Sequence, residues 1–240
     1  MSNKEEFICE RGKSICYRIG SIFRKYYKYS DKKVVASESH IASEILKNDI
    51  NTPKPIGFGY SETRQMFFND FKFHQIRKIN TGELNDNILK NTIGLLNQFP
   101  TKIDCCDSWN IKYLPELFQQ IDSTNLEQKK EAKIILNYLN NYPVKYFIHG
   151  DYSFENIGID ENNNQIIIFD FFDSCIGIEG WDLAYLFGSI PYEKVLVGEI
   201  NDHILKMIKL IVTLKYIRGL RKNFEVLERK KNYEYWWKQN

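Results

Sequence analysis

One segment, residues 146–170, restricts the possible folds and chemistries of this chain more than any other part. Its sequence is YFIHGDYSFENIGIDENNNQIIIFD, in which a first apolar run leads to Asp151 and a later one leads to Asp170. Short apolar runs separated by polar turns such as DENNN are typical of buried strands. An ionised carboxylate beside buried apolar residues is costly unless a cation pairs with it. The segment therefore predicts strands that deliver two carboxylates to a cation-binding cleft.

Asp151, Asn156 and Asp170 occur in the order and spacing that phosphoryl transfer from a magnesium nucleotide requires. In that chemistry one Asp orients the attacking hydroxyl and accepts its proton, while an Asn and a second Asp hold magnesium against the phosphates. The HGDxxxxN spacing equals that of the kinase catalytic loop, with Gly150 in place of its Arg. The alternative is that the three residues only cap turns, which Asp and Asn often do. Their joint occurrence after buried runs favours the catalytic interpretation.

The remaining periodicity predicts an α+β fold with two lobes. Residues 7–29 favour two or three antiparallel strands, residues 37–47 one helix, and the MFF run another strand. From about residue 83 the period becomes helical, with helices expected over 85–99, from 114, over 126–142, from 181 and over 203–224. We expect a small antiparallel-sheet lobe with one helix over residues 1–70 and a mainly helical lobe over 71–240, with a hinge near 69–73.

The composition excludes several classes of protein. The chain has 240 residues, of which 43% are hydrophobic and 27% charged, so we expect a folded domain rather than disorder. A net charge of +2 argues against a nucleic-acid partner. The five cysteines lack CxxC spacing and the four histidines lack a zinc pattern, which predicts free thiols in a reducing cytoplasm. The charged N-terminus and the lack of a long apolar run predict neither a signal peptide nor a membrane span. The oligomeric state stays open.

The segments HGDYSFEN and IIIFDFFDSCIGIEGWDLA resemble the signature of the aminoglycoside phosphotransferase / choline kinase group, small-molecule kinases with a protein-kinase-like fold. The resemblance is strong over residues 145–190, fainter in the front third and weakest elsewhere. It implies that Asp151 is the catalytic base and that Asn156 and Asp170 bind Mg²⁺. It also implies supporting roles for His149, which would stabilise the loop through hydrogen bonds, and for Asp182, which would anchor it.

The front third is similar to the nucleotide-binding lobe of the same group. ERGKSICYRIG, which contains Ser14, corresponds to the turn over the phosphates and its flanking strands. The basic residue that binds the α- and β-phosphates would be Arg24 or Lys25, because strand alternation lets only one of them face the cleft. Counting back from CYRI favours Arg24, whose guanidinium would bind phosphate in a bidentate manner.

Two further nucleotide contacts follow from the resemblance. The acidic partner of the basic residue would be Glu38 or Glu44 on the following helix, and the spacing to the NTPKP break favours Glu38. The backbone near Asn69 and Phe71 would meet the adenine, as the hinge of such kinases does.

The expected function is transfer of the γ-phosphate of ATP, with Mg²⁺, to a hydroxyl of a small molecule, either an aminoglycoside or a related hydroxylated compound. GTP is the alternative nucleotide, because the hinge reads the base through backbone groups. A choline/ethanolamine- or homoserine-type metabolite is the alternative acceptor. A macromolecular acceptor is disfavoured by the single glycine of ERGKS. A catalytically weak nucleotide-binding module is the alternative from another class.

The sequence offers two kinds of acceptor-binding residue. Polycations would need carboxylates, and the candidates are Asp173, Glu155, Glu179, Asp104 and Asp107. Quaternary amines would need an aromatic cage, and the candidates are Trp109, Trp181, Tyr233, Tyr235, Trp236 and Trp237. For the four aromatic residues of the C-terminal cluster, packing between helices is the favoured interpretation.

Overall fold

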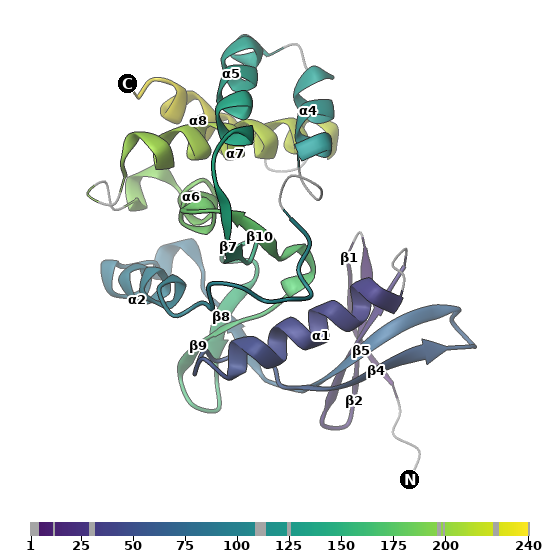
Figure 1. Cartoon of the computed structure of the whole chain (residues 1–240). Coiled ribbons are helices and arrows are strands. Elements are labelled where there is room, and N and C mark those ends of the chain that lie inside the picture. The colour runs from purple at the N-terminus through teal and green to yellow at the C-terminus, as the bar shows by residue number, and fades with distance from the viewer. Residues whose placement is uncertain are drawn as a thin grey trace.

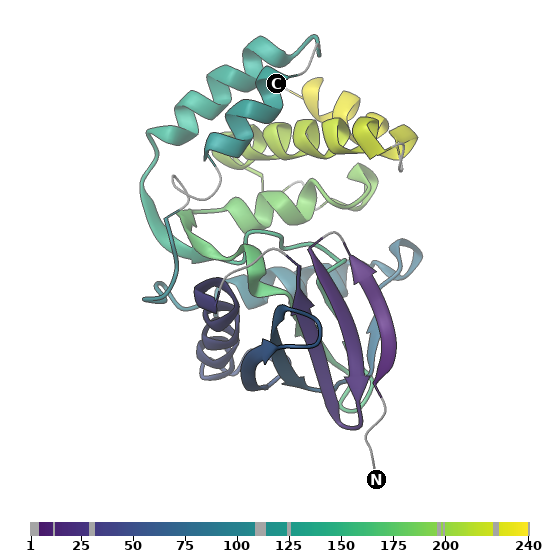
Figure 2. The ribbon, with the colours of Figure 1, turned by 90° about the vertical axis from the view of Figure 1, so that its right-hand side faces the viewer.

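A computed structural model of the chain describes residues 5–11, 13–28, 32–108, 114–123, 126–195, 198, 200–222 and 226–239. Its N-terminal part is a five-stranded antiparallel sheet with the spatial order β1-β2-β3-β5-β4. The helix α1 lies against β4 and β5, on one side of the sheet (Figures 1 and 2). The elements are β1 (Glu6–Arg11), β2 (Ser14–Ile19), β3 (Ile22–Tyr27), α1 (Lys32–Leu46), β4 (Pro55–Ser61) and β5 (Met66–Lys72).

The sheet contains one strand that the sequence pattern did not predict. The NTPKPIGFGY segment was interpreted only as a helix break, but Pro55 begins β4. Because β4 is the edge strand of the sheet, a proline at its first position removes no hydrogen bond from the interior of the ladder.

The larger part of the molecule is mainly helical and holds two small sheets. The order β6-β8-β9 forms one sheet and β10-β7 the other. The strands are β6 (Ile76–Lys78), β7 (Val144–Ile148), β8 (Ile157–Asp160), β9 (Gln165–Ile168) and β10 (Cys175–Ile178). The helices are α2 (Asp86–Leu96), α4 (Leu114–Asp122), α5 (Lys129–Asn140), α6 (Trp181–Phe187), α7 (Asp202–Lys222) and α8 (Val226–Trp237), with short 3-10 turns η1 (Thr81–Glu83), η2 (Phe171–Asp173) and η3 (Tyr192–Lys194).

The predicted two-lobed α+β architecture is therefore confirmed. The first sheet ends at Lys72 and the sheet of the helical lobe begins at Ile76, so residues 73–75 connect the lobes. In Figure 1 the helices α4, α5, α7 and α8 form the upper half, and the five-stranded sheet lies below them. Within the described residues, no helix is both long enough and apolar enough to cross a membrane. All five cysteines are free thiols.

The aromatic C-terminal cluster packs between helices, as the favoured interpretation expected. Tyr233 and Trp236 are buried in the core of the helical lobe, and Tyr235 stacks on Tyr192 with ring centres 3.9 Å apart. Trp181 is also buried. These side chains are committed to the core rather than to an open cage, and Trp109 lies outside the described residues.

Candidate active site

The catalytic loop leaves β7 at His149, and one carboxylate holds its backbone. The two carboxylate oxygens of Asp182 accept hydrogen bonds from the backbone N–H groups of His149 at 2.7 Å and Gly150 at 2.9 Å. Gly150 has φ +86°, a left-handed conformation that favours glycine. Asp182 lies in the first turn of α6 and is buried. The loop is thus fixed to the helical lobe from behind.

Burial raises the pKa of Asp182 to about 6, although the His149 and Gly150 N–H groups and the nearby imidazole oppose the shift. A folded-state pKa above the unfolded value means that the stabilising contribution is present at low pH and is lost as the pH rises. Relative to Asp182→Asn, the wild-type free energy of unfolding should fall by up to about 3 kcal/mol as the pH rises from about 4 to about 6. Urea denaturation of both proteins across this range tests this; parallel pH profiles would contradict it.

His149 is fully buried and uses both ring nitrogens within the loop. Its Nδ1 accepts from the backbone N–H of Asp151 at 3.3 Å, and its Nε2 lies 3.1 Å from the carbonyl oxygen of Phe169. Because the first partner is a donor and the second an acceptor, the ring carries its proton on Nε2. This geometry suits a residue that positions Asp151 and links the loop to the segment before Asp170.

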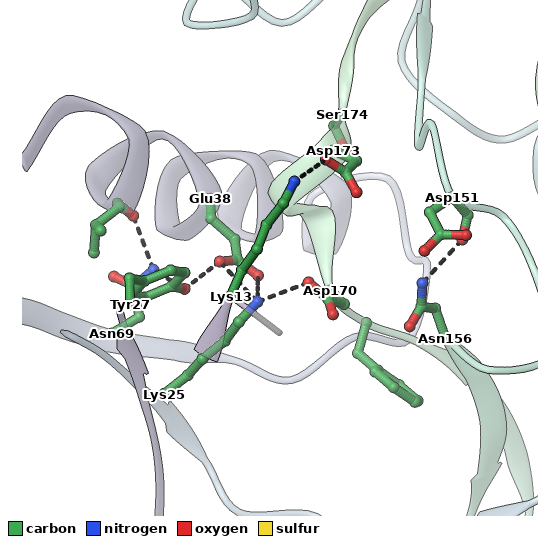
Figure 3. Close-up of polar contacts among 12 residues, drawn as sticks. Lys13, Lys25, Tyr27, Glu38, Asn69, Asp151, Asn156, Asp170, Asp173 and Ser174 are labelled. Atoms are coloured by element: carbon green, nitrogen blue, oxygen red, sulfur yellow. Dashed lines mark hydrogen bonds and ion pairs between the residues drawn. The ribbon is translucent and has the colours of Figure 1, made fainter. Parts of the chain in front are cut away.

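Asn156 and Asp170 are brought together by backbone pairing. The N–H of Phe169 donates to the carbonyl of Asn156 at 3.0 Å, and β8 pairs with β9 directly beyond it. The side-chain amide of Asn156 donates to the carbonyl of Asp151 at 3.0 Å (Figure 3). Asp170 has φ +68° and ψ +62°, a left-handed conformation that Asp tolerates better than most residues. The turn directs its carboxylate out of the strand direction and into the cleft.

Lys25 and not Arg24 faces this cleft. Lys25 Nζ lies 2.9 Å from Glu38 Oε1 and 2.7 Å from Asp170 Oδ1 (Figure 3). Burial alone would lower the pKa of Lys25, but the carboxylates of Asp170 and Glu38 outweigh it and raise that pKa well above its ordinary value. Of the two predicted helix carboxylates, Glu38 is the one beside the lysine, because Glu44 is paired with Lys47 at 2.6 Å instead.

The preference for Arg24 is wrong. Its Nε and Nη2 each lie 2.7 Å from an oxygen of Asp70, directly across the β3–β5 ladder. Its guanidinium also lies 4.0 Å from the centre of the Phe68 ring. Successive side chains of a strand point to opposite faces, and α1 covers the face that carries Lys25. Arg24 is therefore on the outer face of the sheet.

Lys25→Met should lower kcat/KM for the nucleotide by roughly 10- to 100-fold, the usual cost of losing a hydrogen bond to a charged group. The neighbouring Arg24→Met is the matched control, since it removes a cation from the same strand but from the outer face, and it should leave kcat/KM unchanged. Initial rates of ADP formation at varied nucleotide concentration give both values. A larger loss of kcat/KM in Arg24→Met than in Lys25→Met would show that Arg24 is the residue that binds the phosphates.

A cavity of about 350 Å³ extends from Asp170 and Lys25 to the connection between the lobes. Ser14 and Phe71 line it, together with residues 72–76. Asn69 does not, because its amide donates to the carbonyl of Val35 at 2.8 Å, under α1. Of the two residues predicted near the adenine, Phe71 therefore lines the cavity and Asn69 does not, and whether either meets a base stays a prediction.

Two backbone groups of the lobe connection are hydrogen-bonded to neighbouring segments. The N–H of Phe73 donates to the carbonyl of Ser21 at 2.8 Å, and the carbonyl of Gln75 accepts from the N–H of Glu161 at 2.9 Å. Between them, the backbone N–H of His74 has no hydrogen-bond partner among the described residues. His74 itself lines the cavity, so its backbone is suited to reading the edge of a base.

The predicted acidic acceptor residues are scattered. Asp173 lies 3.8 Å from Lys13 at the tip of the β1–β2 hairpin (Figure 3). Asp104 and Asp107 are exposed and lie within 3.4 Å of Lys102 and 3.9 Å of Lys33, respectively. Glu155 and Glu179 are exposed. These carboxylates do not form one cluster among the described residues.

Two residues on the acceptor side were missed by the sequence analysis. Burial raises the pKa of Tyr185 well above its ordinary value, and the charge of the nearby Asp151 raises it further. Lys215 lies over the Tyr185 ring, with its Nζ 4.5 Å from the ring centre. The only sequence pattern that could have pointed to Tyr185 was its i,i+3 spacing from Asp182, which places both on one face of a helix. No sequence pattern distinguished Lys215 from the other lysines of its long helix.

Comparison with solved structures places this fold among known kinases. Aminoglycoside 2'-phosphotransferase-IIIa in its GDP complex has a TM-score of 0.67 at 16% identity, covering 98% of this chain and 93% of that one. The amicoumacin kinase hAmiN, in complex with AMP-PNP, Ca²⁺ and Ami, has a TM-score of 0.71 at 14% identity, covering 98% and 87%. A choline/ethanolamine kinase family protein from Mesorhizobium loti has a TM-score of 0.59 at 14% identity, covering 97% and 85%. No curated protein matches the chain.

The family model described as "Phosphotransferase enzyme family" matches residues 35–203, which is more than half of the chain. The match spans the loop at residues 149–156, the segment that carries Asp170 and the helix α6 that anchors the loop, but not β3 with Lys25. The chain therefore belongs to the phosphotransferase enzyme family and is a kinase that uses a hydroxyl group as its acceptor.

Proposed function

We propose that this kinase transfers the γ-phosphate of ATP to a hydroxyl group of a small molecule, with Asp151 as the base and Asn156 and Asp170 as Mg²⁺ ligands. The observation that carries the proposal is the 3.0 Å hydrogen bond from the N–H of Phe169 to the carbonyl of Asn156. It holds the two prospective metal ligands side by side, next to the loop that carries Asp151. Turn residues without chemistry would not need this convergence.

The donor set fits Mg²⁺. Asp170 supplies carboxylate oxygens, and the amide nitrogen of Asn156 is already bonded to the Asp151 carbonyl, which leaves its amide oxygen for a cation. No cluster of three or more His, Cys, Asp or Glu side chains suited to a metal occurs in the described part of the chain. A site with one carboxylate and one amide agrees with the usual coordination of Mg²⁺, which binds through one or two side chains plus substrate phosphates. When bound there, the ion would neutralise charge on the phosphate oxygens.

The nucleotide is proposed to occupy the cavity between the lobes, with its base at residues 73–75 and its phosphates near Lys25. The buried ion pair with Glu38 would keep Lys25 charged and correctly placed. ATP is the proposed donor and GTP the alternative. The similar solved structures support a nucleotide in general, since one holds GDP and another AMP-PNP.

Asp151 is proposed to accept the proton of the acceptor hydroxyl as the hydroxyl oxygen forms its bond to the γ-phosphorus. The bond from that phosphorus to the bridging oxygen breaks, and ADP leaves with the electron pair. His149 and Asp182 would keep the loop rigid during this step, because both are buried and fully engaged with its backbone.

The test is ADP formation from ATP or GTP, with and without Mg²⁺, across several aminoglycosides, choline, ethanolamine, homoserine and common sugars. We expect Mg²⁺-dependent ADP or GDP formation that requires one class of acceptor. Tight nucleotide binding with no transfer to any of these acceptors would favour the catalytically weak nucleotide-binding module instead.

A further inference from the structure

Lys215, in the middle of α7, lies beside the catalytic loop on the side away from the nucleotide cavity. It lines a second cavity of about 370 Å³. The walls of this cavity come from the residues directly after Asp151 and Tyr152, from the end of α6, and from α7 and α8. The lining residues from these elements are Ser153, Phe154, Glu155, Gly188, Ser189, Val212, Lys215, Glu228, Arg229 and Asn232.

The ammonium group of Lys215 has no anionic partner in the described part of the chain. It makes no hydrogen bond and no ion pair there, and its contact is the face of the Tyr185 ring at 4.5 Å. Burial lowers the pKa of Lys215, and the charges of Asp151 and Glu155 only partly oppose this. A half-buried cation without an anionic partner is unfavourable. A ligand whose anionic group pairs with Lys215 would therefore gain binding affinity.

The charges around Lys215 point to the sign of that ligand. Arg229 and Arg218 are near enough to lower the pKa of Lys215 further. Arg229 also donates to the backbone carbonyl of Lys215 at 3.0 Å. The carboxylates of this cavity, Glu155 and Glu228, belong to exposed residues. The less exposed part of the cavity is therefore basic, which opposes a polycation.

We propose that the phosphate acceptor carries an anionic group, a carboxylate or a phosphate, which pairs with Lys215 while the acceptor hydroxyl reaches Asp151. The inference rests on the proposed function and specifies its substrate class. Lys215 lines the same cavity as Ser153, Phe154 and Glu155 of the loop that carries Asp151, so one small molecule can contact both. A polycationic aminoglycoside in this cavity would bring its amines against Lys215 and Arg229.

The test uses acceptors that differ in one anionic group: glycerate and glycerol phosphate against glycerol, and homoserine against homoserinol, in which a CH2OH group replaces the carboxylate. Wild type, Lys215→Met and Lys206→Met are compared in ADP formation and in thermal stabilisation by each compound with Mg-ADP present. Lys206 is the matched control. It lies on the same helix as Lys215, α7, and its Nζ lies 4.7 Å from the centre of the ring of Tyr138 in α5. Its replacement removes a similar cation–ring contact away from the loop.

We expect wild type and Lys206→Met to favour the anionic member of a pair. Lys215→Met should raise KM for that member roughly 10- to 100-fold and leave the neutral member unaffected. Comparison of glycerate with glycerol phosphate shows whether the site prefers a carboxylate or a phosphate. Preference for neutral or cationic acceptors, no response to any anionic member, or an equal loss of kcat for all acceptors in Lys215→Met would overturn the inference. Transfer to a neutral or cationic acceptor that is abolished in Asp151→Asn would still support the proposed function.

Discussion

Asp151→Asn should lower the rate of phosphoryl transfer by about 10²- to 10⁴-fold, the usual contribution of a positioned general base. Asn keeps the size of the side chain but cannot take a proton from the acceptor hydroxyl. Nucleotide affinity should stay at the wild-type value, because Asp151 is not among the described residues that line the nucleotide cavity. Single-turnover ADP formation and titration with an ATP analogue measure the two quantities separately.

The control for this variant is Asp122→Asn. It makes the same exchange at an exposed carboxylate at the end of α4, which pairs with Lys133 and lines neither cavity, and a surface pair of this kind contributes little. Its rate should stay near that of wild type. Transfer by Asp151→Asn at the wild-type rate would show that another group is the base. A parallel loss of nucleotide affinity would show that the substitution distorts the loop.

Asp170→Asn should abolish the part of nucleotide binding that depends on Mg²⁺ and lower transfer by on the order of 10²- to 10³-fold, since a metal ion contributes several kcal/mol of charge stabilisation. Asn is the suitable replacement because, like Asp, it tolerates the left-handed backbone observed at this position. Lys25, whose Nζ lies 2.9 Å from Glu38 Oε1 in the wild type, should keep this pairing in the variant. The local fold should therefore persist while the negative charge is lost.

Calorimetric titration of ATP with and without Mg²⁺ tests the second prediction. Wild type should bind more tightly with the metal, and Asp170→Asn should bind equally under both conditions. A variant that retains the full Mg²⁺ enhancement would remove Asp170 from the metal site. Because Lys25 also touches Asp170 at 2.7 Å, Lys25→Met serves as the comparison: it should weaken binding under both conditions and preserve the enhancement.

The strands and turns of residues 146–170 could be predicted, because they depend on residues that are close together in the sequence. Asp151 and Asn156 are five residues apart on one loop, and the apolar runs IGID and QIII pair across a single polar turn as β8 and β9. A hairpin of this kind fixes its own register. The order of the chemical groups could therefore be read along the chain. The helical periodicity beyond residue 83 was equally local and predicted most of the helices of the second lobe.

The orientation of β3 could not be predicted, because it depends on contacts with segments far away in the chain. Arg24 and Lys25 are adjacent, and their own sequence context does not state which face of the strand the helix α1 will cover. That choice depends on pairing of β3 with β5, more than forty residues later, where Arg24 meets Asp70. The end of β5 depends on a distant segment too: only its pairing with β3 shows that the strand continues to Lys72 and that the connection begins at residue 73.

The family and the two-lobed α+β class could be predicted from the amino-acid sequence alone, because short-range spacing and periodicity encode them. The packing of distant elements was needed to show that Lys25 faces the cleft, that Asp170 turns toward it, and that Lys215 of α7 lines a cavity with the loop after Asp151. These features depend on contacts between segments far apart in the chain. Such contacts are set by how whole elements pack on one another, and no local pattern records that packing.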